Sequence, residues 1–92
     1  MREIYIRKLR YEEAHEKLER EIQRAFVEGE IYIEIVHGIG EGILKRMAME
    51  YIQAQDFLRL IPRPDMIRTN PGSTLVELLA PSAEILRKYM KS

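Results

Sequence analysis

The sequence contains no cysteine and no tryptophan among its 92 residues. Without cysteine, the chain has neither a disulfide framework nor a thiolate metal site, and its composition is compatible with a cytoplasmic setting. No apolar run approaches the ~20 residues that cross a bilayer, and the opening MREIYIRKLR is too charged for a signal peptide. We therefore expect neither a disulfide-rich protein nor a protein that spans or is targeted to a membrane.

An excess of charge of either sign is also missing. The chain has 15 basic and 15 acidic residues, so its formal net charge is zero. A protein that simply coats nucleic acid usually carries a large basic excess, so recognition of phosphate here requires a local cluster of charge. Ten of the basic residues are arginine, whose guanidinium group suits bidentate contacts with phosphate. With 46% hydrophobic residues, a chain of this length has one small domain and a single core.

Hydrophobic spacing predicts the element order β-α-β-α-β-β-α. The predicted strands are residues 2–9, 30–36, 57–61 and 74–79, and the predicted helices are residues 11–28, 43–55 and 81–91. Gly29 stands where a left-handed residue would end the first helix. Strand–helix–strand units form right-handed parallel crossovers in about 98% of cases. The first three strands should therefore run in the same direction, with the first two helices on one face of the sheet.

The carboxyl ends of those strands define the candidate site, because loops at that edge of a parallel sheet form the ligand crevice. His37 follows the second strand, and Gly38, Gly40 and Gly42 then lead into the second helix. Unobstructed backbone N–H groups at the start of a helix favour an anion. The candidate phosphate-binding residues are Arg7, Lys8, Arg10, Gly38, Gly40, Gly42, Lys45, Arg46, Arg63 and Arg68.

An ordinary tight turn is the alternative for this glycine loop. Its spacing matches neither the dinucleotide-binding fingerprint nor the P-loop, because residue 43 is isoleucine where both need glycine. The carboxylate of Glu41 is also able to occupy the helix end itself. We assign no metal ligand, since His15 and Glu19 in the first helix lack the two-histidine spacing of a zinc protease. The sequence does not identify a cofactor.

The sheet face turned away from the helices has two interpretations. We expect Ile4, Ile6, Ile31, Ile33, Leu58, Leu60, Val76 and Leu78 to face the helices, and Tyr5, Arg7, Tyr32, Glu34, Arg59 and Glu77 to share the opposite face. Aromatic side chains among basic ones are able to stack nucleic-acid bases. The two glutamates favour cross-strand ion pairs instead.

Three segments of the chain resemble, in order and spacing, the Smr (small MutS-related) domain. They are IYIRKLRYEEAHEKLEREI, IEIVHGIGEGILKRM and NPGSTLVELL, and the resemblance runs from about residue 4 to residue 79. Its most specific part is the H-G-x-G-x-G loop from His37 to Gly42. The resemblance implies a two-layer α/β sandwich with a mixed four-stranded sheet, similar to the C-terminal domain of translation initiation factor three. Residues 80–92 would then form a C-terminal helical extension, either a packing or a dimer element.

The resemblance also implies that DNA or RNA is the partner and, in many members of the family, that the domain is an endonuclease. Some members belong to MutS-type proteins that suppress recombination, and others act in ribosome-linked RNA cleavage, so a MutS-type protein or the ribosome is a second kind of partner. His37 is the catalytic candidate, because an imidazole with a pKa of about 6.5 donates and accepts protons near neutral pH.

The first strand departs from the family pattern. Members typically carry Leu-Asp-x-His-Gly there, whereas this chain reads Ile4, Tyr5, Ile6, Arg7 and Lys8. Arginine in place of the histidine still suits phosphate, but tyrosine removes a carboxylate that could orient water, a histidine or a metal. Two hypotheses therefore stand: a nucleic-acid-binding domain with weak or residual endonuclease activity, or a non-catalytic module that binds a protein or the ribosome.

Overall fold

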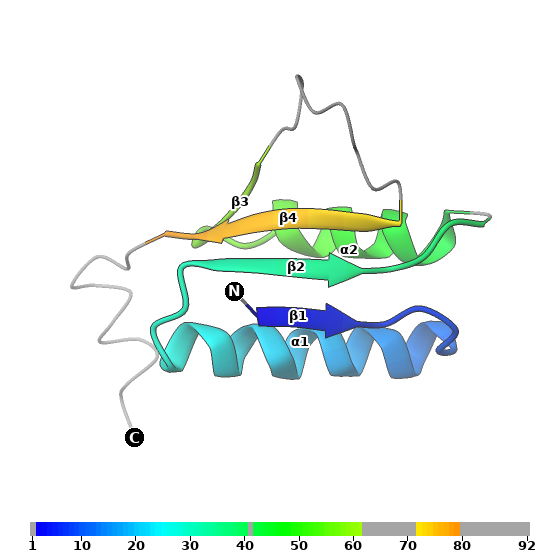
Figure 1. The fold of residues 1–92 in the computed structure, drawn as a ribbon, viewed down its shortest axis with the longest axis horizontal. Coiled ribbons are helices and arrows are strands. Elements are labelled where there is room, and N and C mark those ends of the chain that lie inside the picture. Colours follow the sequence, from blue (N-terminus) through cyan, green and yellow to red (C-terminus); the bar gives the residue numbers. More distant parts are fainter. Residues whose placement is uncertain (1, 41, 62–71, 80–92) are drawn as a thin grey trace.

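The protein is described here from a computed structural model, which places residues 2–40, 42–61 and 72–79. Its elements, labelled in Figure 1, are β1 (Arg2–Tyr5), α1 (Tyr11–Val27), β2 (Tyr32–Val36), α2 (Ile43–Gln53), β3 (Leu58–Leu60) and β4 (Ser73–Leu78). Six of the seven predicted elements are present in the predicted order. The predicted helix over residues 81–91 lies outside the described residues, as do Arg63 and Arg68.

The four strands form one mixed sheet in the order β1-β2-β4-β3. β1 pairs parallel with β2, whereas β4 pairs antiparallel with both β2 and β3. The strands β1, β2 and β3 consequently run in the same direction, as predicted, and β4 runs against them between β2 and β3. The carboxyl ends of β1 and β2 thus lie at one end of the sheet, together with the start of β4 (Figure 1).

The two helices form the second layer, and each turns one apolar stripe inward. In α1 the buried residues are Ala14, Leu18, Ile22 and Ala25, at the three- and four-residue spacing of one helix face. The helix ends as predicted, with Gly29 in the left-handed region at φ +78°. In α2 the buried residues are Met47, Ala48 and Ile52. They join the inward-facing residues of the strands in one core, which includes Ile4, Ile6, Ile33, Ile35 and Val76.

The expected inward position of Ile31 is wrong, because 59% of this residue is exposed. β2 begins only at Tyr32, and the N–H of Glu30 still donates to the carbonyl of Ala25 at 2.9 Å. Ile31 therefore lies between the turn that leaves α1 and the first residue of β2, outside the alternating part of the strand.

The opposite face of the sheet carries polar and aromatic residues. Tyr5 and Tyr32 are about half exposed there, at 50% and 45%. Arg59 forms an ion pair with Glu77 directly across from it, which is the predicted cross-strand alternative. Glu34 accepts a hydrogen bond of 2.6 Å from the Ser73 hydroxyl. Arg7 was expected on this face but lies in the turn after β1 instead. Within the described ranges, no helix is long and apolar enough to cross a membrane.

Candidate functional site

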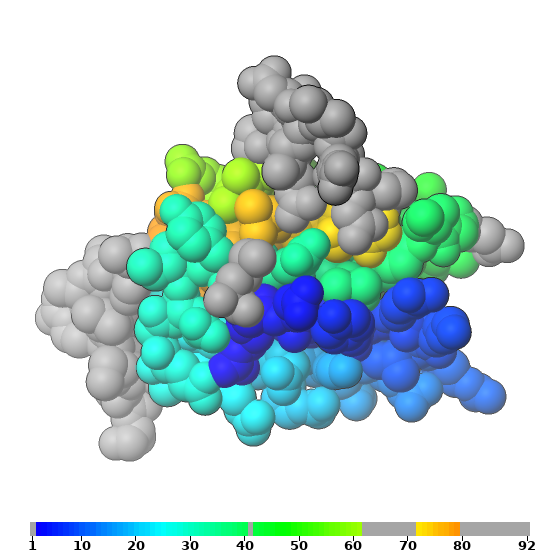
Figure 2. Space-filling model, viewed as in Figure 1, coloured from blue at the N-terminus to red at the C-terminus, as the bar shows by residue number. Residues whose placement is uncertain are grey.

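The turns that follow β1 and β2 touch each other. Because the two strands are parallel, the N–H groups of Ile6 and Arg7 both donate to the carbonyl of Val36, at 2.9 and 3.1 Å. Just beyond, Gly38 has φ +81°, and a Cβ atom added to it would lie 3.2 Å from the Cβ of Arg7. In Figure 2 the blue β1–α1 turn and the green residues after β2 lie at the same end of the molecule. The predicted convergence of Arg7 with the glycine loop is therefore observed.

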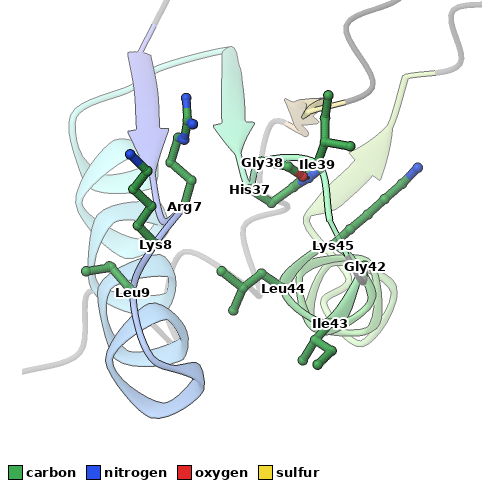
Figure 3. A pocket seen from close by; sticks show the side chains of 10 residues that line it. All are labelled: Arg7, Lys8, Leu9, His37, Gly38, Ile39, Gly42, Ile43, Leu44 and Lys45. Atoms are coloured by element: carbon green, nitrogen blue, oxygen red, sulfur yellow. The ribbon is translucent and has the colours of Figure 1, made fainter.

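A pocket of about 410 Å³ lies between these turns and the start of α2. Its lining, shown in Figure 3, consists of Arg7, Lys8, Leu9, His37, Gly38, Ile39, Gly42, Ile43, Leu44 and Lys45. Leu9 and Leu44 are partly buried and pack against the core. In Figure 3 the side chains of Arg7 and Lys8 extend side by side from the turn after β1, whereas the side chain of Lys45 extends from α2 away from them. Among the described lining residues there are thus three cations and no carboxylate.

The first turn of α2 borders this pocket with backbone donors. Gly42 is the N-cap at φ +80° and has no side chain that could cap the helix. The first backbone bond of α2 runs from the N–H of Arg46 to the carbonyl of Gly42 at 2.9 Å. The N–H groups of residues 43–45 precede it and have no partner within the helix. The positive end of the helix dipole therefore adds to the charge of the three cations.

His37 is 4% exposed, and both nitrogens of its ring have partners within the protein. Nδ1 lies 3.0 Å from the carbonyl oxygen of Gly38, and Nε2 lies 2.8 Å from the Oγ1 of Thr74. Because a carbonyl only accepts, Nδ1 carries the proton, and Nε2 of the neutral ring accepts from the Thr74 hydroxyl. Burial lowers the pKa of His37 below its usual 6.5, and Lys45 lowers it further, against the opposite effect of the Gly38 carbonyl. The ring is therefore neutral at pH 7.

The start of β4 holds the glycine loop through Gly72 and Thr74. The Gly72 carbonyl accepts from the N–H groups of both His37 and Gly38, each at 2.9 Å. The expectation that the Gly38 amide is open to an anion is therefore wrong, because that amide is bonded to Gly72. Sequence reasoning did not single out either residue as an anchor of the loop. The one signal was that residues 72–78 close the segment in which the chain resembles Smr domains.

The remaining predicted site residues are spread more widely. Arg10 is the N-cap of α1 and lines a separate hollow with Tyr11, Glu12 and Glu13. Arg46 is exposed on α2, and neither it nor Gly40 is among the lining residues of the glycine-loop pocket. Glu41, Arg63 and Arg68 lie outside the described residues. The part of the chain with described positions contains no cluster of three His, Cys, Asp or Glu residues that could hold a metal.

Comparison with known proteins places these features in a family. The family model for the Smr domain matches residues 4–79. Endonuclease MutS2 of Lactococcus lactis subsp. cremoris (strain MG1363) is 30% identical over 76 residues, which is 83% of this chain and 10% of that protein. Endonuclease MutS2 of Lactobacillus helveticus (strain DPC 4571) is 29% identical over 76 residues, with the same coverage of 83% and 10%. The chain thus corresponds to about a tenth of the length of these relatives.

A solved structure shows the same fold. The crystal structure of the Smr domain of Thermus thermophilus MutS2 matches with a TM-score of 0.76 and 22% sequence identity. The match covers 87% of this chain and all of that one, at 100%. The mixed sheet with two helices is therefore the architecture of that domain.

Proposed function

The chain belongs to the Smr domain family, and on this premise we propose that it binds nucleic acid by accepting a backbone phosphate in the glycine-loop pocket. The observation that carries the proposal is that Arg7, Lys8 and Lys45 line one pocket with the first turn of α2, whose amides have no partner within the helix. A local cluster of this kind gives a neutral chain the positive potential that its composition lacks.

Each group has a distinct role in this proposal. The guanidinium of Arg7 makes bidentate contacts with two phosphate oxygens, whereas Lys8 and Lys45 act as point charges. The amides at the start of α2 hold an oxygen from a fixed direction, because Met47, Ala48 and Ile52 pack the helix against the core. These contacts recognise the backbone and carry no sequence information.

Binding is better supported than cleavage. A general acid or base needs a ring nitrogen within hydrogen-bond reach of the substrate. Both nitrogens of His37 are already bonded, to Gly38 and Thr74, so a substrate would have to displace one of these partners. Tyr5, which stands where the family typically has aspartate, lies half exposed on the sheet face, and its hydroxyl donates to Glu3 at 3.3 Å. We propose that His37 holds the glycine loop in its binding conformation, and that endonuclease activity is weak or residual.

Lys45 and Arg46 form a matched pair for testing the pocket. They are adjacent in α2 and both cationic, but only Lys45 lines the pocket. We expect Lys45→Ala and Arg7→Ala each to weaken the binding of labelled single-stranded, duplex and branched DNA and of RNA. Each should also reduce the slope of log affinity against log salt by about 0.7 to 0.9 for one lost phosphate contact. Arg46→Ala should leave that slope unchanged.

Fluorescence anisotropy at several salt concentrations measures these slopes. Equal losses for Lys45→Ala and Arg46→Ala would show that general surface charge, and not the pocket, binds the polymer. Binding of a protein partner that is insensitive to salt and to both variants, with no binding of nucleic acid, would favour the interaction-module hypothesis.

A nicking assay on supercoiled DNA and a cleavage assay on structured RNA test the catalytic part. We expect wild-type protein to cleave little above background, and His37→Ala to cleave no less. Clear cleavage by wild type that His37→Ala abolishes, with the fold retained by circular dichroism, would make His37 catalytic and overturn the assignment of a holding role.

A further inference from the structure

Another hollow, of about 440 Å³, lies at the end of the sheet opposite to the glycine-loop pocket. Its walls come from the end of α1, the turn into β2 and the end of β4, which Figure 1 shows together at one end of the molecule. The residues that matter here are Phe26, Glu30, Ile31, Glu77, Leu78 and Leu79. We call this hollow the β4-end groove. Four of these six residues are apolar, and Ile31 is 59% exposed.

The walls of the β4-end groove are held by backbone bonds. The N–H of Leu78 donates to the carbonyl of Ile31 at 2.7 Å, and the N–H of Leu79 donates to the carbonyl of Phe57 at 2.9 Å. The ring of Phe26 packs against that of Phe57, with centroids 4.7 Å apart. The groove is thus preformed, and its exposed apolar surface is stabilised when an apolar side chain covers it.

We propose that the β4-end groove binds the C-terminal segment of the same chain, residues 80–92. The described chain ends at Leu79, which is itself part of the groove, so the segment starts at its binding site without a linker. Its sequence, APSAEILRKYMKS, predicts a helix with four apolar residues on one side, namely Ile85, Leu86, Tyr89 and Met90. An unattached peptide would lose translational freedom on binding, whereas a tethered segment is already present at high effective concentration.

Charge supports the same occupant. The segment has three basic side chains, Arg87, Lys88 and Lys91, against one acidic side chain, Glu84. At the groove end of the molecule, Arg2 forms ion pairs with Glu21, Glu28 and Glu30. Arg24 also pairs with Glu21, and Arg59 pairs with the groove residue Glu77, so four described carboxylates stand against three cations. Carboxylates therefore outnumber cations there, which favours a basic segment and disfavours a nucleic-acid phosphate. Such exposed pairs contribute little stability, but they orient the segment.

A cysteine-free chain allows a single introduced thiol to report on the groove. Ile31→Cys places the thiol in the groove, and Val27→Cys places it on a residue that is 80% exposed and outside the lining. In the full chain, with rates normalised to those of the unfolded variants, we expect Ile31→Cys to react with a neutral maleimide at least ~10-fold more slowly than Val27→Cys. Adding Leu86→Asp should bring the two rates within about twofold. Lys88→Gln, which makes the same change in charge away from the apolar stripe, should leave the protection in place.

Three results would overturn the proposal. Equal rates for Ile31→Cys and Val27→Cys would show that nothing covers the groove. Protection that survives Leu86→Asp would show that something other than this segment does so, and protection that grows with protein concentration would assign the groove to a second copy. Because Ile31→Cys alters the groove, amide hydrogen exchange in chains without it provides a second measurement. There, Leu86→Asp should speed exchange at Leu79 by at least ~10-fold, and unchanged exchange would also contradict the proposal.

Discussion

Replacing Gly38 with alanine tests how closely the two turns of the glycine-loop pocket approach each other. Gly38 has φ +81°, and the new Cβ would lie 3.2 Å from the Cβ of Arg7. An L-residue in the left-handed region costs about 1–2 kcal/mol. Crowding at that distance adds about 1 kcal/mol, the lower end of the range for overpacking. We therefore expect Gly38→Ala to lower the free energy of unfolding by about 2–3 kcal/mol.

Gly29 provides the control, because it has nearly the same backbone conformation without the contact. Its φ is +78°, and no heavy atom lies within 4 Å of an added Cβ. Gly29→Ala should therefore cost only the conformational part, about 1–2 kcal/mol. A second control separates the contact from other effects at Arg7. Arg7→Gly removes the opposing Cβ and should recover about 1 kcal/mol in the double variant with Gly38→Ala, whereas Arg7→Ala keeps that atom and should recover nothing.

Urea unfolding followed by circular dichroism gives these free energies, provided that the slope with urea is the same for all variants. In thermal unfolding, each kcal/mol corresponds to a shift of about 4–8 °C for a domain of this size. If Gly38→Ala costs no more than Gly29→Ala, the two turns do not touch as described. The same conclusion would follow if Arg7→Gly and Arg7→Ala recovered equal amounts.

Three further predictions concern residues around the glycine-loop pocket. Lys8 has φ +67°, so Lys8→Gly should stabilise the fold by about 1 kcal/mol in urea unfolding while weakening nucleic-acid binding, whereas Lys8→Ala should only weaken binding. Thr74→Val removes the hydroxyl 2.8 Å from Nε2 of the buried His37 ring and should cost about 1–3 kcal/mol, and Thr74→Ser should cost less. Because burial lowers the pKa of folded His37 below 6.5, the unfolded chain binds a proton more readily in that window. The stability that the neutral ring contributes is thus complete above pH 6.5 and is lost as pH falls toward the folded pKa. In urea unfolding, the free energy of unfolding of His37→Asn should therefore change less with pH over this range than that of the wild type. An equal change with pH in both proteins would contradict the assignment of a neutral, buried ring.

Much of the fold follows from local spacing, and the directions of the strands follow from the handedness of crossovers. The helices α1 and α2 were predicted within a few residues, because their apolar stripes repeat over several turns. The position of β4 between β2 and β3 does not follow from local spacing. No spacing within residues 73–78 indicates which strands will pair with it, and only the resemblance to Smr domains implied a mixed sheet.

The sequence predicted those contacts of the candidate site that follow from the parallel pairing of two strands. It did not predict contacts with residues that are far away in the sequence. Arg7 meets Gly38 because both directly follow neighbouring strands with the same direction. Arg10 does not join them, because it caps α1, which leads away from the pocket. The amide of Gly38 is taken by Gly72, a contact between residues far apart in sequence that no short motif encodes.

The position of β4 in the sheet has a consequence for synthesis of the chain. Gly72 and Thr74, which fix the glycine loop and the ring of His37, come after β1, α1, β2, α2 and β3 in the sequence. A nascent chain that has not yet reached these residues contains the histidine and the glycines but neither of their anchors. The binding conformation is therefore acquired late, once β4 inserts between two strands that have no other neighbour on that side. Premature termination before Gly72 would yield a fragment with an intact motif and neither anchor of the loop.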